Sequence, residues 1–136
     1  MVIWLIGMSA SGKTVVAQEM IKLLPQCHSQ NSWVLVDGDA FRNIMGEDLG
    51  HTVTDRKKNA DRLCALCAFF DSQGVNVLAC VLSIFHESQD WLREHIDDYR
   101  QVYIQVDYDK LKERDNKELY RQAENGEIDD VVGVQI

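Results

Sequence analysis

Eight residues near the start of the chain have the types and spacing of a phosphate-binding loop. The stretch Gly7-Met8-Ser9-Ala10-Ser11-Gly12-Lys13-Thr14 fits the pattern G-x-x-x-x-G-K-[ST] and follows an apolar run over residues 2–6. The two glycines let the backbone wrap closely around an anion, and the helix that follows adds the positive end of its dipole. Lys13 supplies a charge for the β- and γ-phosphates, and Thr14 supplies a hydroxyl ligand for Mg²⁺. The motif therefore predicts a site for ATP and Mg²⁺.

A second polar group, which contains Asp37, Asp39 and Arg42, follows the apolar run over residues 33–36. In an open parallel sheet the carboxyl ends of the strands face the same crevice as the phosphate loop. An aspartate there can accept a proton from an attacking hydroxyl or orient a metal-bound water, and the arginine can hold a phosphate of the acceptor. The alternative is an Asp-Gly turn whose side chains satisfy backbone donors. Beside a phosphate loop, we favour the catalytic interpretation.

A third polar group comprises Arg56, Asn59 and Arg62, spaced by three residues at the start of a helical pattern. This spacing puts the three side chains on one side of the helix. The structural alternative is a solvated polar face, and we favour it for the charged residues between them. The three spaced residues remain candidates for binding an acceptor.

Apolar runs rich in β-branched residues alternate with helical patterns along the chain. Strands are expected over residues 2–6, 33–36, 75–82 and 101–106. A first helix is expected over residues 12–24 and ends at Pro25, and a second begins at an N-cap, Thr54, and stops at Gly74. Two more helices are expected over residues 87–96 and 110–123. The alternation predicts an α/β fold with a parallel sheet and crossover helices.

Composition limits the class of protein. The 136 residues, 46% hydrophobic and 26% charged, suit about one domain with a single core. A formal charge of −8 argues against a general surface for nucleic acid or anionic membrane. No apolar run reaches the roughly 18 residues of a membrane span, and the first run is too short for a secretory signal. We expect a cytoplasmic protein with no nucleic-acid or membrane partner.

Two further features concern the cysteines and the chain end. Cys64 and Cys67 have C-x-x-C spacing, but they lie in an apolar helical stretch with no second pair to complete a metal site. We expect both to be buried free thiols. The apolar tail over residues 131–136 has little to pack against in a four-stranded sheet. We therefore expect the chain to stop before a fifth strand, although a sheet of four strands stays open.

Taken together, the motifs resemble those of adenylylsulfate kinases, which phosphorylate the 3′-hydroxyl of adenosine 5′-phosphosulfate with ATP. The resemblance lies in the phosphate loop, Asp37-Gly38-Asp39 with Arg42, Asp48-Leu49-Gly50, Asp55-Arg56 with Asn59 and Arg62, Glu113-Arg114-Asp115, Leu119-Tyr120, Ala123 and Gly126-Glu127-Ile128. It implies a single P-loop kinase domain over 1–136, with the three-layer P-loop NTPase fold.

The resemblance also implies roles for individual residues. Asp39, together with Asp37, would assist the acceptor hydroxyl, and Lys13 would act on the phosphates. The acceptor nucleotide would be held by Arg42, Arg56, Asn59 and Arg62. The segment over about 114–133 would be a mobile lid, whose Arg114 and Lys117 meet phosphate charge as it closes.

The chain departs from the family pattern at two places near the acceptor. His51 stands where the family has a phenylalanine that stacks on adenine, and Ser83-Ile84-Phe85-His86 stands where it has Ser-Pro-Tyr-Arg. These residues are candidate acceptor contacts that favour another nucleotide.

Three functions are therefore open: an adenylylsulfate kinase, a sister enzyme such as the cytidine diphosphoramidate kinases of bacterial capsule pathways, or a nucleotide-binding module without turnover. The intact Lys13, Thr14, Asp37, Asp39 and Arg56 favour a kinase. The expected partner is a small-molecule nucleotide acceptor, and a homodimer is left open.

Overall fold

A parallel β-sheet forms the centre of the molecule. The structure, a computed structural model, describes residues 1–28, 30–46, 48–115 and 118–136. Within these ranges the sheet has four strands in the order β2-β3-β1-β4, and every neighbouring pair is parallel. The strands are β1 (Val2–Gly7), β2 (Trp33–Asp37), β3 (Asn76–Val81) and β4 (Tyr99–Ile104). The predicted parallel α/β fold is therefore confirmed.

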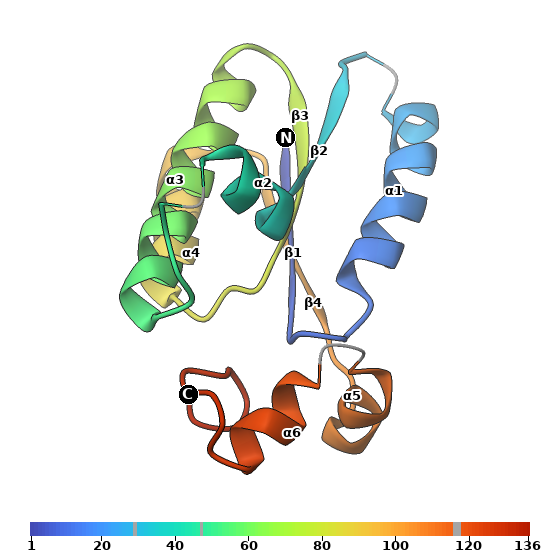
Figure 1. Cartoon of the computed structure of the whole chain (residues 1–136). Coiled ribbons are helices and arrows are strands. Elements are labelled where there is room, and N and C mark those ends of the chain that lie inside the picture. Colours follow the sequence, from blue (N-terminus) through green and yellow to red (C-terminus); the bar gives the residue numbers. More distant parts are fainter. Residues whose placement is uncertain (29, 47, 116–117) are drawn as a thin grey trace.

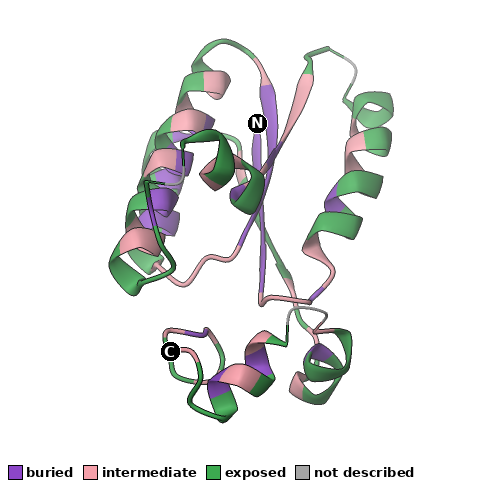
Figure 2. Cartoon of the chain, in the orientation of Figure 1, coloured by how far each residue is buried: buried purple, intermediate pink, exposed green. Residues whose placement is uncertain are grey.

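The two central strands, β1 and β3, are apolar on both faces. Every residue of β1 and of β3 is buried, as Figure 2 shows for β1 along its length. Such continuous burial is expected where helices cover both faces of a parallel sheet. Leu5 pairs with Cys80 of β3 on one side and with Val102 of β4 on the other. The β1 strand thus fixes the position of the loop that follows it.

Helices cover both faces of the sheet. They are α1 (Lys13–Cys27), α2 (Gly38–Ile44), α3 (Val53–Ser72), α4 (His86–His95), α5 (Tyr108–Arg114) and α6 (Leu119–Glu124). The α1 helix lies on one face, whereas α3 and α4 lie on the other (Figure 1). This arrangement confirms the predicted three layers. None of the helices in the described ranges is long and apolar enough to cross a membrane.

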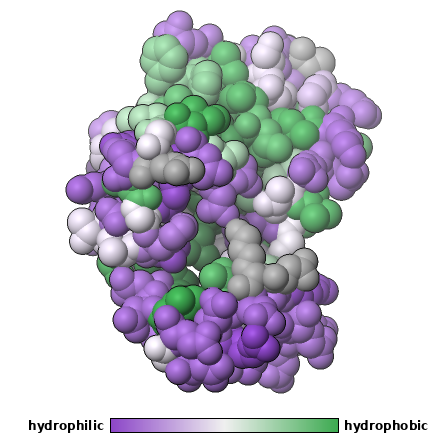
Figure 3. All heavy atoms as spheres, in the orientation of Figure 1, coloured by the Kyte–Doolittle hydropathy of each residue, from purple (hydrophilic) through white to green (hydrophobic). Residues whose placement is uncertain are grey.

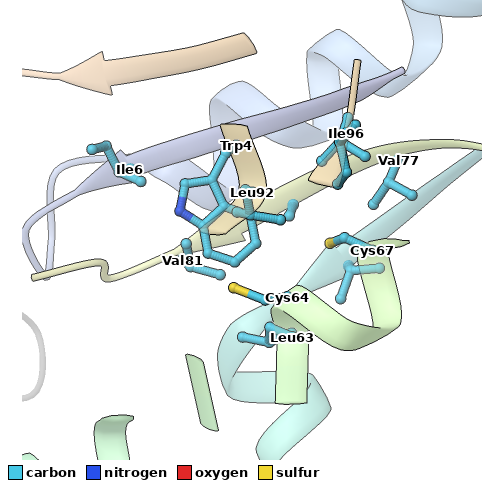
Figure 4. Close-up of a cluster of buried hydrophobic side chains, with 12 residues drawn as sticks. Trp4, Ile6, Leu63, Cys64, Cys67, Val77, Val81, Leu92 and Ile96 are labelled. Atoms are coloured by element: carbon cyan, nitrogen blue, oxygen red, sulfur yellow. The ribbon is translucent and has the colours of Figure 1, made fainter. Parts of the chain in front are cut away.

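The larger core lies between the sheet and the α3–α4 pair. Its central side chain is Trp4, fully buried against Cys64, Leu92 and their neighbours (Figure 4). Cys67, from the next turn of α3, is also fully buried in this cluster. Both C-x-x-C thiols are therefore free and buried, as predicted, while Cys27 at the end of α1 is exposed.

Several element boundaries differ from the sequence-based expectations. The α1 helix continues through Pro25 to Cys27, because Pro25 lies in the last turn and the carbonyl of Leu24 still accepts a bond from the N–H of His28 at 2.8 Å. The N-cap of α3 is Thr52 and not Thr54, since the Thr52 hydroxyl accepts from the Asp55 N–H.

Three short helices also differ from the expectations. The α2 helix directly after β2 was not predicted, and the helix expected over residues 110–123 is divided into α5 and α6. Before α6, Glu118 has φ 53° in the left-handed region, which an α-helix cannot contain. The predicted strand over 101–106 begins two residues earlier, at Tyr99.

The α5 and α6 helices and the tail after them form a lower body beneath the carboxyl ends of the strands (Figure 1). Its buried residues are Leu111, Tyr120, Ala123 and Val131. Val131 is 7% exposed, so the expectation that the tail has little to pack against was wrong. Figure 3 shows that this body is mostly hydrophilic on its outer face, whereas hydrophobic side chains gather over the upper part of the molecule.

Candidate active site

The loop between β1 and α1 has the backbone conformation that a phosphate-binding loop requires. Gly12, the N-cap of α1, has φ 89°, and Ala10 has φ 61°; both lie in the left-handed region. The Ser11 N–H bonds to the carbonyl of Met8 at 3.2 Å, which closes the turn. A Cβ at Gly7 would lie 2.9 Å from the backbone carbonyl oxygen of Ile104 and 2.8 Å from the Ser11 hydroxyl, and since the carbonyl belongs to β4, no side chain fits there. The first glycine of the motif is thus needed for this tight turn.

Two polar side chains of the loop, those of Lys13 and Ser11, form no ion pair among the described residues. Lys13 donates to its own loop at the carbonyl of Met8, 2.6 Å away. Burial lowers the pKa of Lys13, and the negative charges of Asp39 and Asp37 oppose that shift. The Ser11 hydroxyl is buried without a hydrogen-bond partner among the described residues. A partly desolvated ammonium beside an orphaned hydroxyl suits an incoming anion.

Asp37 connects the end of β2 to both the loop and α2. One carboxylate oxygen accepts the Asp39 and Ala40 N–H groups at 3.0 and 3.1 Å, which makes Asp37 the N-cap of α2. The other accepts from the Thr14 hydroxyl at 3.2 Å. The Thr14 hydroxyl predicted as a Mg²⁺ ligand is therefore adjacent to the carboxylate of Asp37, although 23 residues separate them in sequence.

The charge of the exposed Asp39 acts on a cation in each half of the site. Its negative charge raises the pKa of Lys13 in the loop, against the lowering effect of burial. It acts in the same direction on Arg56 of α3, whose pKa is lowered by burial and by the positive charge of Arg42. One carboxylate thus interacts with a cation from each side of the site.

Arg42 and the loop before α3 hold each other in place. The Arg42 guanidinium donates to the carbonyl of Gly50 through Nη1, whereas its Nε is buried without a partner among the described residues. Asp55 accepts from the Gly50 N–H at 3.1 Å and from the Thr52 hydroxyl at 2.8 Å. These bonds fix the loop from which His51 projects.

Arg56 and Asn59 both point toward the site from α3. The Nε of Arg56 donates to the carbonyl of His51 at 2.8 Å, and its Nη2 donates to the carbonyl of Asp130 at 3.4 Å. Asn59 is buried and donates to the carbonyl of Gly38 at 3.5 Å, while its Oδ1 has no partner within the described ranges. A buried acceptor without a partner is unusual in a folded protein and marks Asn59 as a candidate for a role in the site.

The remaining candidates are placed less centrally. Arg62 forms a two-bond ion pair with Asp48, at 2.8 and 2.6 Å, so its guanidinium is already engaged. The loop after β3 contains Ser83, which accepts from the Nε2 of Gln89 at 3.2 Å, and Ile84. Phe85 is the N-cap of α4, with Lys57 5.9 Å from its ring centre, and exposed His86 begins that helix.

The predicted lid residues lie in the lower body. Arg114 is exposed at the end of α5, and Lys117 lies outside the described residues. Two contacts of this body with the site were not anticipated. The carbonyl of Asp130 accepts a hydrogen bond from Arg56, and the Tyr120 hydroxyl donates to the carbonyl of Ser9 at 2.7 Å. Pairs separated by 74 and 111 residues leave no signal in local sequence patterns.

Comparisons with known proteins agree with this geometry. A family model described as adenylylsulphate kinase matches residues 1–136. The cytidine diphosphoramidate kinase of Campylobacter jejuni is 36% identical over 138 residues, which span 99% of this chain and 78% of that protein. The adenylyl-sulfate kinase of Bacillus velezensis is 34% identical over 135 residues, which span 98% and 68%.

Among solved structures, the APS kinase of Mycobacterium tuberculosis in complex with AMPPNP and APS has a TM-score of 0.85 and 30% identity. The match covers 98% of this chain and 79% of that one. The family model, the relatives and this structure agree, and the chain belongs to the adenylylsulfate kinase family.

Proposed function

We propose that the chain transfers the γ-phosphate of ATP to the 3′-hydroxyl of a 5′-modified nucleotide, of which adenosine 5′-phosphosulfate is the first candidate. Membership of the family makes it a phosphotransferase with an alcohol group as acceptor. The observation that carries the proposal is the place of Asp39 in the first turn of α2, beside the N-cap Asp37 that bonds Thr14 of the phosphate loop. The charge of Asp39 also acts on Lys13 and on Arg56 of α3. A base for the acceptor hydroxyl has to lie between donor and acceptor.

The donor half of the site fits a nucleoside triphosphate and a metal ion. The left-handed Ala10 and Gly12 and the unpartnered Ser11 hydroxyl suit a loop whose N–H groups bind phosphate. Thr14 and Asp37 would hold Mg²⁺, which neutralises charge on the phosphates when bound. Lys13 would exchange its hydrogen bond to the carbonyl of Met8 for bonds to the phosphate oxygens. A charged hydrogen bond to phosphate would offset the desolvation of the ammonium, which lowers the pKa of Lys13.

The transfer step requires three actions of the chain's own residues. Asp39 accepts the proton of the acceptor hydroxyl as the new O–P bond forms and the bond from the γ-phosphorus to the β-phosphate oxygen breaks. Lys13 stabilises the negative charge on the transferred group and the leaving ADP. Arg42, Arg56 and Asn59 orient the acceptor, so that its hydroxyl faces the donor.

A second acceptor, cytidine diphosphoramidate, is favoured by two exposed histidines. His51 and His86 stand where the family pattern has an adenine-stacking phenylalanine and an arginine. Aromatic stacking on a base is worth on the order of 1–3 kcal/mol, so a smaller ring weakens adenine recognition. A histidine also lacks the fixed charge that an arginine offers to a sulfate.

Phosphoryl transfer from labelled ATP to both acceptors tests the proposal. Adenosine 5′-phosphosulfate and cytidine diphosphoramidate are compared as acceptors for the wild-type protein and the double variant His51→Phe/His86→Arg. If the histidines set specificity, the double variant gains kcat/KM on adenosine 5′-phosphosulfate and loses it on the cytidine compound. Efficient wild-type transfer to adenosine 5′-phosphosulfate, with no gain in the variant, would assign that acceptor and make the histidines neutral. No transfer to either would refute the proposal.

A further inference from the structure

The lower body touches the phosphate loop through one buried tyrosine. Tyr120 is fully buried, and its hydroxyl donates to the carbonyl of Ser9 at 2.7 Å. Its ring packs edge-on against Tyr108, with 5.6 Å between ring centres, and its N–H donates to Asp115 at 2.8 Å. These contacts fix the backbone, the ring and the hydroxyl of Tyr120, so its hydroxyl is held where it meets the loop.

The Ser9 carbonyl is attached to the peptide group that presents the Ala10 N–H. In a trans peptide the carbonyl and the N–H point in opposite directions. A donor that holds the Ser9 carbonyl toward the lower body therefore turns the Ala10 N–H away from that body. The side that faces away from the lower body is then the concave side of the loop. In a phosphate-binding loop, successive N–H groups converge on the anion at that side.

The conformation at Ala10 needs such a support. Its φ of 61° is left-handed, a conformation that is unfavourable for a residue with a Cβ and nearly free of cost for a glycine. Ala10 and Met8 also pack against the cluster around Tyr120. At Gly133 an added Cβ would lie only 1.9 Å from the end of the Met8 side chain, so the tail and the loop are in close contact. The outer side of the loop thus rests on the lower body.

We infer that Tyr120 is a positioning residue of the phosphate loop, whose hydroxyl keeps the strained Ser9–Ala10 peptide in the orientation that binds triphosphate. Burial raises the pKa of Tyr120 to about 12, so the hydroxyl stays protonated and remains a donor at neutral pH. The inference rests on the proposed function only in requiring that this loop binds a nucleoside triphosphate.

The test is the affinity for AMPPNP, measured by calorimetry on the full chain, because it needs no acceptor. Tyr120→Phe removes one hydroxyl and keeps the ring in the core. We expect its Kd to rise roughly three- to tenfold, as one lost hydrogen bond implies, with KM for the acceptor unchanged. Tyr108→Phe is the matched control, since it deletes the hydroxyl of the neighbouring ring, which bonds at 3.1 Å to the exposed Glu124 and not to the loop.

A second variant links the effect to the strained residue. Ala10→Gly permits the left-handed conformation without a Cβ, so Tyr120→Phe should cost less affinity in that background than in the wild type. Equal Kd values for the wild type and Tyr120→Phe would overturn the inference, and so would an equal loss in Tyr108→Phe. If the wild type binds AMPPNP but transfers phosphate to no acceptor, the proposed function fails, while the ratio of Kd values still decides the role of Tyr120.

Discussion

The sharpest prediction from the site concerns Asp39→Asn. This change removes the carboxylate that would accept the hydroxyl proton and keeps the size of the side chain. Removing a positioned base costs about 10²–10⁴ in rate, so kcat should fall by at least about a hundredfold. The fold should persist, because Asp39 is exposed and the N-cap bonds of α2 come from Asp37.

The same structure predicts the effect on ATP. The charge of Asp39 acts on Lys13, so its loss leaves the ammonium with less competition for phosphate. ATP affinity should therefore stay the same or increase. Asp109→Asn is the control, because it makes the same change at the second residue of another short helix. The α5 helix has seven residues, as α2 has, and Asp109 is exposed like Asp39.

Single-turnover and steady-state transfer assays, together with AMPPNP titration, separate these effects. A variant whose ATP affinity collapses, but whose rate at saturation is unchanged, would refute the assignment. Asp39 would then serve the metal ion or the nucleotide and not the acceptor hydroxyl.

Four further predictions concern the loop, a helix cap and, in two cases, the thiols. Lys13→Met should abolish transfer without lowering the melting temperature, because burial of the Lys13 charge opposes folding; an enzyme that is still active would exclude the proposed donor site. Thr52→Ala should lower the free energy of unfolding by about 1 kcal/mol in urea titrations, and Thr54→Ala, two residues after the cap, should lower it by much less. A thiol reagent at pH 8 should modify Cys27 rapidly and the buried cysteines only on unfolding. Burial raises the pKa of Cys67 from 9.0 to about 12, so the stability that depends on the neutral thiol is complete below pH 9 and should be lost as pH rises toward 12. The free energy of unfolding, measured against pH for the wild type and Cys67→Ala, checks this. A wild type that gains stability over this range relative to the variant would contradict the prediction.

The parts of the site that depend on local sequence were predictable. The phosphate loop is specified by residues within one turn, and its glycines mark the positions where the backbone approaches closely or becomes left-handed. The two central strands were predictable because β1 is apolar along its length and β3 is apolar after Asn76, as a sheet covered on both faces requires. Asp37 could be placed near Thr14 because parallel strands end at the same edge.

The parts that depend on distant contacts were not predictable. Proline usually ends a helix, yet α1 continues past Pro25 for two residues. In the last turn a proline removes only one backbone hydrogen bond, because it lacks the N–H. The α2 helix is too short to show a periodic pattern. The contacts of Tyr120 with Ser9 and of Arg56 with Asp130 arise only when the lower body packs beneath the sheet.

The central claim, that Asp39 directs a nucleotide 3′-hydroxyl to the γ-phosphate, is tested most directly by the choice of acceptor hydroxyl. Label transfer from [γ-³²P]ATP is measured with each candidate nucleotide, in parallel with its 3′-deoxy and 2′-deoxy analogues. We predict that the 2′-deoxy analogue of the true acceptor is labelled, that the 3′-deoxy analogue is not, and that Asp39→Asn loses at least about a hundredfold in rate. Labelling of the 3′-deoxy analogue, or release of phosphate from ATP at the same rate with and without acceptor, would contradict the claim.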